Sequence, residues 1–123
     1  MKKLLVVEDD DSVRTLAARA LERAGYAVDV ATNGKAGLDK IEAAGGQYDL
    51  IISDVRMPGM DGIEMAKAAA RSYPDIRILF VTGYADQRER AAELDSVVAG
   101  VLQKPFTLVE IRARVDRLLV VAA

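Results

Sequence analysis

Short apolar runs alternate with segments of helical periodicity along this chain, and the alternation repeats five times. Each apolar run is about five residues long, which suits a buried strand and falls far short of the ~20 residues that span a membrane. A strand followed by a helix returns the chain to the same end of a sheet, so repeated strand–helix units build a parallel sheet. The sequence therefore predicts an α/β fold with five parallel strands.

The expected elements follow the hydrophobic pattern. Strands are expected over residues 3–8, 26–31, 49–54, 77–82 and 99–103. The first helix stops at Gly25 and buries a face that carries Val13, Leu16, Ala17, Ala20, Leu21 and Ala24. Further helices are expected over residues 35–44, 62–72, 87–94 and 108–121, with capping boxes of Asp86 with Glu89 and Thr107 with Glu110 before the last two. We expect one domain, residues 1–123, without an output domain.

Composition excludes several classes of protein. The net charge of −2 argues against a nucleic-acid surface, which is normally basic. The chain has no cysteine and no histidine, which excludes disulfides, thiolate chemistry and a histidine-ligated zinc site. Basic residues precede the first apolar run, but that run stops at Glu8, too early for a signal peptide. We expect a cytoplasmic protein that binds neither nucleic acid nor membrane.

Four of the expected strands lead into side chains that can handle a phosphoryl group. Glu8 and Asp9 come at the end of the first strand, and Asp54 ends the third. Thr82 ends the fourth strand, and Lys104 follows the fifth. The carboxyl ends of parallel strands lie at one edge of the sheet, where ligands bind. We therefore expect carboxylates, a hydroxyl and an ammonium around one crevice.

This combination suits a divalent cation and a phosphorylated aspartate. Carboxylates held close together repel one another, and a hard cation such as Mg²⁺ removes that repulsion. Asp54 is the candidate nucleophile, because an aspartate can attack phosphorus and form an acyl phosphate. Lys104 would neutralise the phosphoryl oxygens, and a cis Lys104-Pro105 bond would aim it into the crevice. Thr82 would donate a hydrogen bond to a phosphoryl oxygen.

Each of these residues also has a plainer interpretation. Acids after a strand commonly cap the next helix, and this is the favoured interpretation for Asp10 and Asp11. Taken alone, Lys104 is a surface lysine and Thr82 is a β-branched strand residue. Asp54 precedes a loop rather than a helix, which argues against a cap. The joint placement, rather than any one residue, indicates phosphoryl chemistry.

Four segments together resemble the receiver domains of response regulators, the CheY-like family, over essentially the whole chain. They are Val6-Val7-Glu8-Asp9-Asp10, Ile52-Ser53-Asp54-Val55-Arg56-Met57-Pro58-Gly59-Met60-Asp61-Gly62, Thr82-Gly83 and Lys104-Pro105-Phe106. The resemblance implies a doubly wound, flavodoxin-like parallel sheet in the order 2-1-3-4-5, with five helices covering both faces.

The resemblance also implies a role for each site residue. Asp54 would be the phosphoacceptor, with Lys104 and Thr82 in contact with the phosphoryl group. Mg²⁺ would be bound by Asp9, Asp54 and the backbone carbonyl of Arg56, and by Glu8 mostly through water. The donor would be a phosphohistidine on a sensor histidine kinase or a histidine phosphotransfer protein. Apart from its own phosphorylation and dephosphorylation, such a protein is not an enzyme.

Three positions near the expected site need comment. Receivers usually carry Tyr or Phe three residues before the lysine, and here Val101 stands at that position. We expect Tyr84, in the segment Thr82-Gly83-Tyr84, to take over this switch on the loop after the fourth strand. The alternative is that Tyr84 only covers the site. Arg56, two residues after Asp54, leaves the rate of dephosphorylation open in either direction.

The chain also resembles stand-alone receivers that act as phosphorylation-gated adaptors, including the CpdR type. We therefore expect a single-domain response regulator of a two-component phosphorelay that signals through protein contacts. The contact surface would join residues 87–94 to the last strand and the last helix. It would include Arg88, Glu89, Arg90, Val101 and Phe106. The end, Val120-Val121-Ala122-Ala123, resembles a degradation tag, although a frayed helix end is the favoured interpretation.

Three alternatives stay open. The chain would also fit a receiver domain taken from a hybrid histidine kinase. A phosphatase with an aspartyl nucleophile would need a second acid two residues after Asp54, where Arg56 stands. A flavin-binding module would need a loop after the first strand that accepts phosphate, and the acidic run from Glu8 would repel it.

Overall fold

The computed structural model describes residues 1–83, 90–91, 94 and 96–120. Its centre is a five-stranded sheet in the order β2-β1-β3-β4-β5, in which all neighbouring strands are parallel. The strands are β1 (Lys3–Val7), β2 (Ala27–Ala31), β3 (Leu50–Asp54), β4 (Ile78–Thr82) and β5 (Val98–Gln103). This order confirms the α/β, CheY-like sheet predicted from the sequence.

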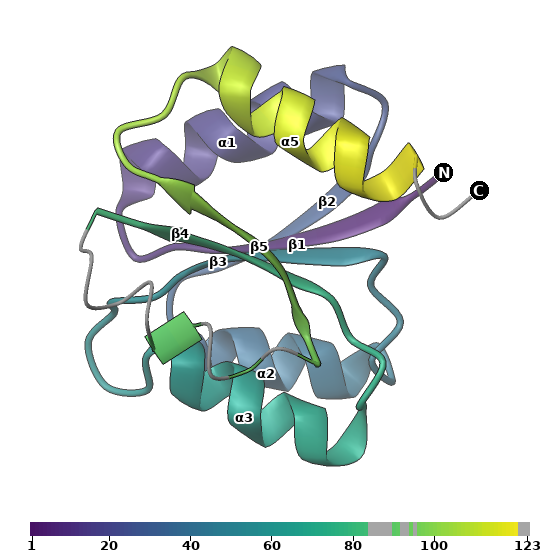
Figure 1. Ribbon diagram of the computed structural model, residues 1–123, viewed down its shortest axis with the longest axis vertical. Coiled ribbons are helices and arrows are strands. Elements are labelled where there is room, and N and C mark those ends of the chain that lie inside the picture. Colours follow the sequence, from purple (N-terminus) through teal and green to yellow (C-terminus); the bar gives the residue numbers. More distant parts are fainter. Residues whose placement is uncertain (84–89, 92–93, 95, 121–123) are drawn as a thin grey trace.

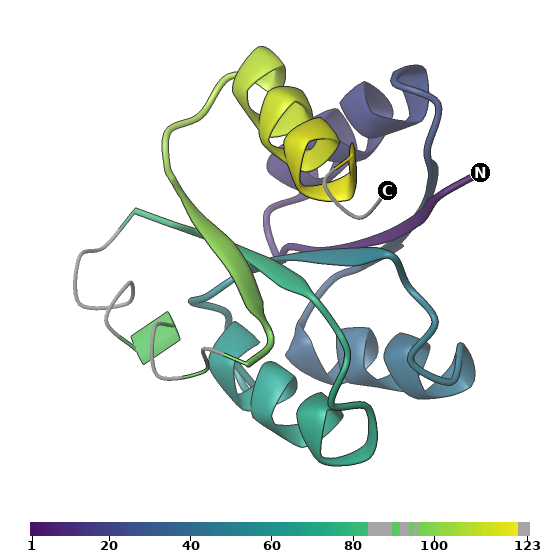
Figure 2. The same cartoon turned by 45° about the vertical axis from the view of Figure 1, so that its right-hand side comes forward.

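Helices cover both faces of the sheet (Figure 1). One face carries α1 (Asp11–Arg23) and α5 (Leu108–Val120), and the other carries α2 (Gly34–Ala43) and α3 (Gly62–Ser72). The view in Figure 2 shows the same two layers from a second direction. The helix predicted over residues 87–94 falls mostly outside the described residues, although Arg90 and Ala91 within it are helical.

Other predictions also concern residues outside the described part. Asp86 and Glu89, expected to form a capping box, lie there, and so does Tyr84. The same holds for the last three residues of the expected degradation tag, and all of these stay predictions. Among the described residues, no helix combines the length and the apolar character needed to cross a membrane.

Two hydrophobic clusters hold the helices on the sheet. Leu4, Val6, Leu50 and Ile52 belong to the cluster that packs with α1 and α5. Alternate strand residues, such as Leu5 and Ile51, belong to the cluster on the α2–α3 face. Because β1, β3 and β4 are buried on both faces, they are continuous apolar runs rather than alternating ones. The polar residues at their ends therefore lie next to a rigid core.

The N-terminal caps of the helices confirm two predictions, and one further capping box was not predicted. Asp10 is the N-cap of α1 and accepts a hydrogen bond from the backbone N–H of Val13 at 3.0 Å. Thr107 and Glu110 exchange the two bonds of the expected capping box, each at 3.0 Å. Asp61 and Glu64 form a further capping box at α3, whose Asp-x-x-Glu pattern is visible in the sequence.

One predicted core position is different. Leu16 was expected on the buried face of α1, but it is 50% exposed. The packed row of α1 runs through Ala17 and Leu21, so Leu16, one residue earlier, is turned towards the edge of the α1–α5 layer. There it lines an open groove with Leu108. Strand and helix ends otherwise differ from the predicted ones by only one or two residues.

Candidate functional site

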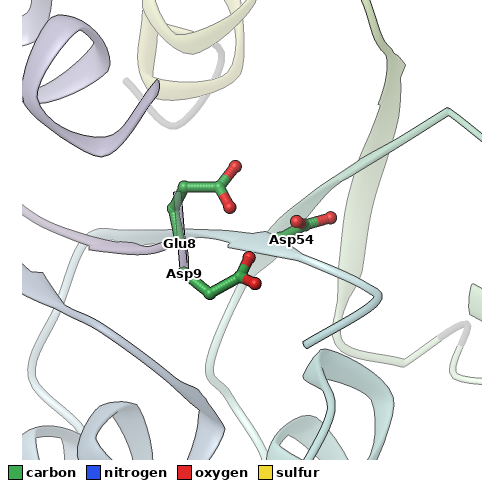
Figure 3. A group of neighbouring side chains, drawn as sticks. All are labelled: Glu8, Asp9 and Asp54. Atoms are coloured by element: carbon green, nitrogen blue, oxygen red, sulfur yellow. The ribbon is translucent and has the colours of Figure 1, made fainter. Parts of the chain in front are cut away.

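Three carboxylates meet at the carboxyl edge of the sheet. Glu8 and Asp9 follow β1, and Asp54 is the last residue of β3. The parallel register pairs Val7 with Ser53, so the residues after this pair emerge side by side. One carboxylate oxygen each from Glu8, Asp9 and Asp54 lies within 4.8 Å of the other two, and Figure 3 shows the three side chains together. The sequence prediction that these acids converge is met by the structure.

The carboxylates differ in burial, and one has a shifted pKa. Glu8 and Asp54 are only 4% and 8% exposed, whereas Asp9 faces solvent. Partial desolvation, together with the hydrogen bond and the negative charge of Glu8, raises the pKa of Asp9 above its usual value. Desolvation is the largest cause and the negative charge of Glu8 adds to it, so a bound cation would relieve the repulsion between the two carboxylates.

Lys104 enters the same cluster from the end of β5. Its Nζ donates to Glu8 Oε1 at 2.9 Å and to Asp54 Oδ2 at 3.1 Å. Burial by itself lowers the pKa of Lys104, but the bond to Glu8 and the charge of Asp54 outweigh it and raise that pKa. The Lys104-Pro105 peptide bond is cis, as the sequence suggested. Lys104 is therefore charged at neutral pH and lies against the candidate acceptor.

Thr82 lies at the end of β4, next to the strand that carries Asp54. The register pairs Val81 with Asp54, and Thr82 follows with an exposure of only 1%. Its carbonyl accepts the backbone N–H of Lys104 at 2.9 Å, which joins the ends of β4 and β5. Thr82, Lys104 and the candidate acceptor Asp54 thus lie at the ends of three adjacent strands.

Close packing fixes the backbone of Asp54. The hydroxyl of Ser53 donates to the carbonyl of Asp54 at 2.9 Å, and Gly62 N–H donates to the carbonyl of Val55 at 2.8 Å. A Cβ atom at Gly62 would lie only 2.1 Å from the Asp54 carbonyl oxygen, so only glycine fits there. The backbone of Asp54 is therefore held directly against the first turn of α3.

An open pocket of about 480 Å³ gives access to the three carboxylates and to Lys104, but Thr82 is not among its lining residues. It is lined by Glu8, Asp9, Asp10, Val13, Asp54, Arg56, Gly83 and Lys104. Three carboxylates are the hard oxygen donors that Mg²⁺ or a similar cation prefers, and the open side leaves room for waters and a phosphoryl group. The donor set therefore fits a hard divalent cation. Arg56 is exposed at the pocket wall.

Sequence reasoning missed one residue that supports Glu8. Arg14, on α1, donates from Nη1 to the backbone carbonyl of Glu8 at 2.9 Å. The Glu8 side chain also accepts the backbone N–H of Asp10 at 3.2 Å. A basic residue one turn into the helix after the acidic run was a visible signal, but its direction depends on how α1 packs. Arg14 holds the backbone from which the acids project.

The described part of the chain includes two of the three predicted switch residues, Thr82 and Val101. Val101 lies on β5, half-buried against the α2–α3 side of the core, and its carbonyl accepts from Arg114 Nη1 at 3.2 Å. Tyr84 is outside the described residues. An aliphatic residue does stand where the family usually has an aromatic one, and the switch roles of Thr82, Tyr84 and Val101 stay predictions.

Comparison with known proteins agrees with this geometry. The family model described as "Response regulator receiver domain" matches residues 4–116. The response regulator receiver protein CpdR of Brucella abortus (strain 2308) is 35% identical over 122 residues, which are 99% of this chain and 100% of that protein. Sensor kinase CckA of the same organism is 38% identical over 116 residues. This match covers 94% of this chain but only 12% of CckA.

A solved structure gives the same result. The response regulator TrrA of Thermotoga maritima, in complex with Mg²⁺-BeF, superimposes with a TM-score of 0.84 and 34% identity. The match covers 97% of this chain and 100% of that chain. Receivers take part in two-component signalling, in which histidine kinases or phosphotransfer proteins are their partners. The sheet order, the acidic edge and these matches show that the chain belongs to the response regulator receiver family.

Proposed function

We propose that Asp54 accepts a phosphoryl group from phosphohistidine on a sensor histidine kinase or a histidine phosphotransfer protein. One observation carries the proposal: the Asp54 carboxylate opens into a solvent-connected pocket with Lys104 Nζ at 3.1 Å. A carboxylate oxygen of Asp54 attacks phosphorus and forms an acyl phosphate. The bond from phosphorus to the donor imidazole breaks, and its electron pair stays on the imidazole nitrogen. Hydrolysis by water later restores the carboxylate and releases inorganic phosphate.

The neighbouring residues prepare Asp54 for this reaction. Lys104 holds its positive charge beside the developing phosphoryl oxygens, since its pKa is raised. Thr82 donates its hydroxyl to one of them. Glu8, Asp9, Asp54 and the backbone carbonyl of Arg56 would hold Mg²⁺, which when bound neutralises phosphoryl charge. Arg14 keeps the Glu8 backbone in place.

The output is a change in protein contacts. Phosphorylation at Asp54 biases a two-state surface made of residues 87–94, β5 and α5. Val101, Phe106 and Arg90 belong to it, and a downstream protein target binds there. Because Val101 is aliphatic, Tyr84 takes the part of the family's aromatic switch.

The domain context follows from the two kinds of relative. CpdR is matched over its whole length, which supports a single-domain regulator over residues 1–123. The match to a small part of CckA supports a second context, a receiver within a longer hybrid kinase. The cytoplasmic location expected from the sequence stays a prediction.

Intact mass spectrometry after incubation with acetyl phosphate tests the proposal. The wild-type protein should gain one phosphoryl group, about 80 Da, only when Mg²⁺ is present. Asp54→Asn should gain none, whereas Asp29→Asn, which alters a carboxylate on β2, should behave as wild type. If neither acetyl phosphate nor a competent histidine kinase labels Asp54, the chain is not a phosphoacceptor.

A further inference from the structure

Asp61 uses both of its carboxylate oxygens, and each serves a different element. Oδ1 accepts the backbone N–H of Glu64 at 2.8 Å and thereby caps α3. Oδ2 accepts from Nη2 of Arg90 at 3.0 Å, a residue 29 positions further along the chain. One side chain therefore connects the end of the acceptor loop, residues 55–61, to the helical turn at Arg90 and Ala91.

The backbone that joins Asp61 to the proposed acceptor, Asp54, has little freedom to move. Gly62 follows Asp61, and a Cβ atom there would lie 2.1 Å from the carbonyl oxygen of Asp54. The N–H of Gly62 donates to the carbonyl of Val55 at 2.8 Å. A shift of Asp61 must therefore move the backbone of Asp54 or break this packing.

On the side of Arg90, the turn is tied to the core and to β5. Ala91 is fully buried in the cluster on the α2–α3 face. Its carbonyl accepts the N–H of Leu94 at 3.0 Å, and the Leu94 carbonyl accepts Val97 N–H and Val98 N–H at 3.0 and 3.1 Å. Val98 is the first residue of β5. The ion pair thus joins the acceptor loop to a segment that leads into β5.

The two partners of the ion pair differ in access to solvent. The Asp61 side chain is 17% exposed, while that of Arg90 is 43% exposed. A protein that binds this surface can therefore contact the Arg90 guanidinium directly, whereas the Asp61 carboxylate is largely shielded. Coupling between two sites is reciprocal, so any effect of Asp54 occupancy on binding at Arg90 is matched by an equal effect of that binding on Asp54 occupancy.

We propose that the Asp61–Arg90 ion pair couples the phosphoryl-acceptor loop to the turn at Arg90 and Ala91, and that Arg90 is a positioning residue for the acceptor site. This inference rests on the proposed function of Asp54. The pair transmits displacement of the loop to the 90–91 turn when the acceptor site is occupied, and in the opposite direction when a partner binds Arg90.

A double-mutant cycle isolates the pair. Asp61→Asn removes the charge but keeps an oxygen that can cap α3. Arg90→Gln removes the guanidinium, and because Arg90 makes further interactions, only the cycle with Asp61→Asn assigns an effect to the pair. Arg71→Gln, on the exposed last turn of α3, is the matched control for loss of one positive charge. Arg90→Lys keeps a cation and should restore much of the coupling.

The readout is the backbone amide resonance of Ala91 during titration with Mg²⁺ and beryllium fluoride, beside the mass gain with acetyl phosphate. We expect loading to move the Ala91 resonance in the wild type and in Arg71→Gln. In Asp61→Asn and Arg90→Gln the movement should fall by at least half, with loading weakened about two- to fivefold. The double variant should be no worse than either single one. Circular dichroism melting checks that each variant is folded.

Two results would overturn the inference. An unchanged Ala91 movement in both single variants, with the site loading normally, shows that the pair has no part in coupling. Strictly additive effects in the double variant show that Arg90 and Asp61 act separately. Loss of all loading in the wild type is a different failure, because it removes the proposed function and this inference with it.

Discussion

Two clusters of charged residues lie near opposite edges of the sheet, and they differ in how far positive charge offsets negative charge. Near the amino-terminal edge, Asp29 accepts from the Tyr48 hydroxyl at 2.7 Å and lies 3.6 Å from Lys3 Nζ. That ammonium also lies 5.2 Å from the centre of the Tyr48 ring. At the carboxyl edge, the carboxylates of Glu8, Asp9 and Asp54 lie together, and Lys104 pairs with two of them, Glu8 and Asp54. The first cluster is balanced by its own partners, and the second keeps an excess of negative charge around an open pocket.

This difference in charge balance indicates a structural role for the first cluster and a chemical role for the second. A balanced cluster gains nothing from an external ion, and its contacts join Asp29 on β2 to Lys3 on β1 and to Tyr48, which lies just before β3. In a cluster with excess carboxylate charge, the carboxylates repel one another until a cation binds. The electrostatics of the cluster therefore favour cation binding.

The largest effect is expected from Lys104→Gln. This change removes the ammonium beside Asp54 and should slow phosphoryl transfer from acetyl phosphate about 100-fold, because charge on the phosphoryl oxygens is no longer offset. The initial rate of mass gain measures it. Lys3→Gln is the matched control in the balanced cluster and should leave the rate within twofold of wild type, by the same reasoning. Equal rates for the two variants would contradict the contrast.

The next effect concerns Mg²⁺. Only the folded chain holds Glu8, Asp9 and Asp54 together, so Mg²⁺ at ten times its Kd should add about 1.4 kcal/mol to the free energy of unfolding. Urea denaturation with and without Mg²⁺ measures this gain. Glu8→Gln should reduce the gain, whereas Asp29→Asn should keep it. A gain that survives in Glu8→Gln and Asp9→Asn alike would place the ion elsewhere.

A smaller effect is expected at the balanced cluster. Tyr48→Phe removes a hydrogen bond to Asp29 and should cost about 1 kcal/mol of stability, without changing phosphorylation. Burial and the bond to Asp29 raise the pKa of Tyr48. The wild-type advantage is therefore fully present below about pH 10 and is lost as pH rises towards the raised pKa, because the unfolded chain ionises first. Urea denaturation from pH 8 to 11 measures the loss, and a constant difference would contradict it.

The smallest effect is expected from Asp9→Asn in the absence of metal. The raised pKa of Asp9 means that its charged form is disfavoured in the folded chain. At neutral pH the substitution should therefore stabilise the chain, by less than about 1 kcal/mol because Asp9 is exposed and screened. The gain should disappear as pH falls through the raised pKa and Asp9 becomes protonated. Urea denaturation in chelator at pH 7 and pH 4 checks the sign, which Mg²⁺ should reverse.

The strand ends could be predicted from the sequence because they depend on the periodicity of the apolar residues. The apolar runs define where strands stop, and a parallel sheet gathers their carboxyl ends, so Glu8, Asp54 and Lys104 could be placed together from the pattern. The cap at Asp10 and the box at Thr107 follow equally local rules. These inferences need no knowledge of how the helices are rotated.

The contacts that sequence reasoning missed depend on side-chain direction. Arg14 reaches the Glu8 carbonyl and Arg90 reaches Asp61 only because of how their elements are oriented on the core. Leu16 is exposed for the same reason, since periodicity gives a face of the helix but not the exact line of contact. Asp54→Asn and Lys104→Gln test the proposed roles of Asp54 and Lys104 in phosphoryl transfer, and the role of Thr82 stays a proposal.

The close approach of Gly62 to the Asp54 carbonyl has a consequence for protein engineering. Between these two residues the loop has a fixed length, because the Gly62 N–H must meet the Val55 carbonyl. A library that varies the side chains at the exposed positions Arg56 and Pro58 should therefore retain folded members with altered phosphoryl lifetimes. A library that lengthens the loop by even one residue should lose the acceptor geometry in nearly every member.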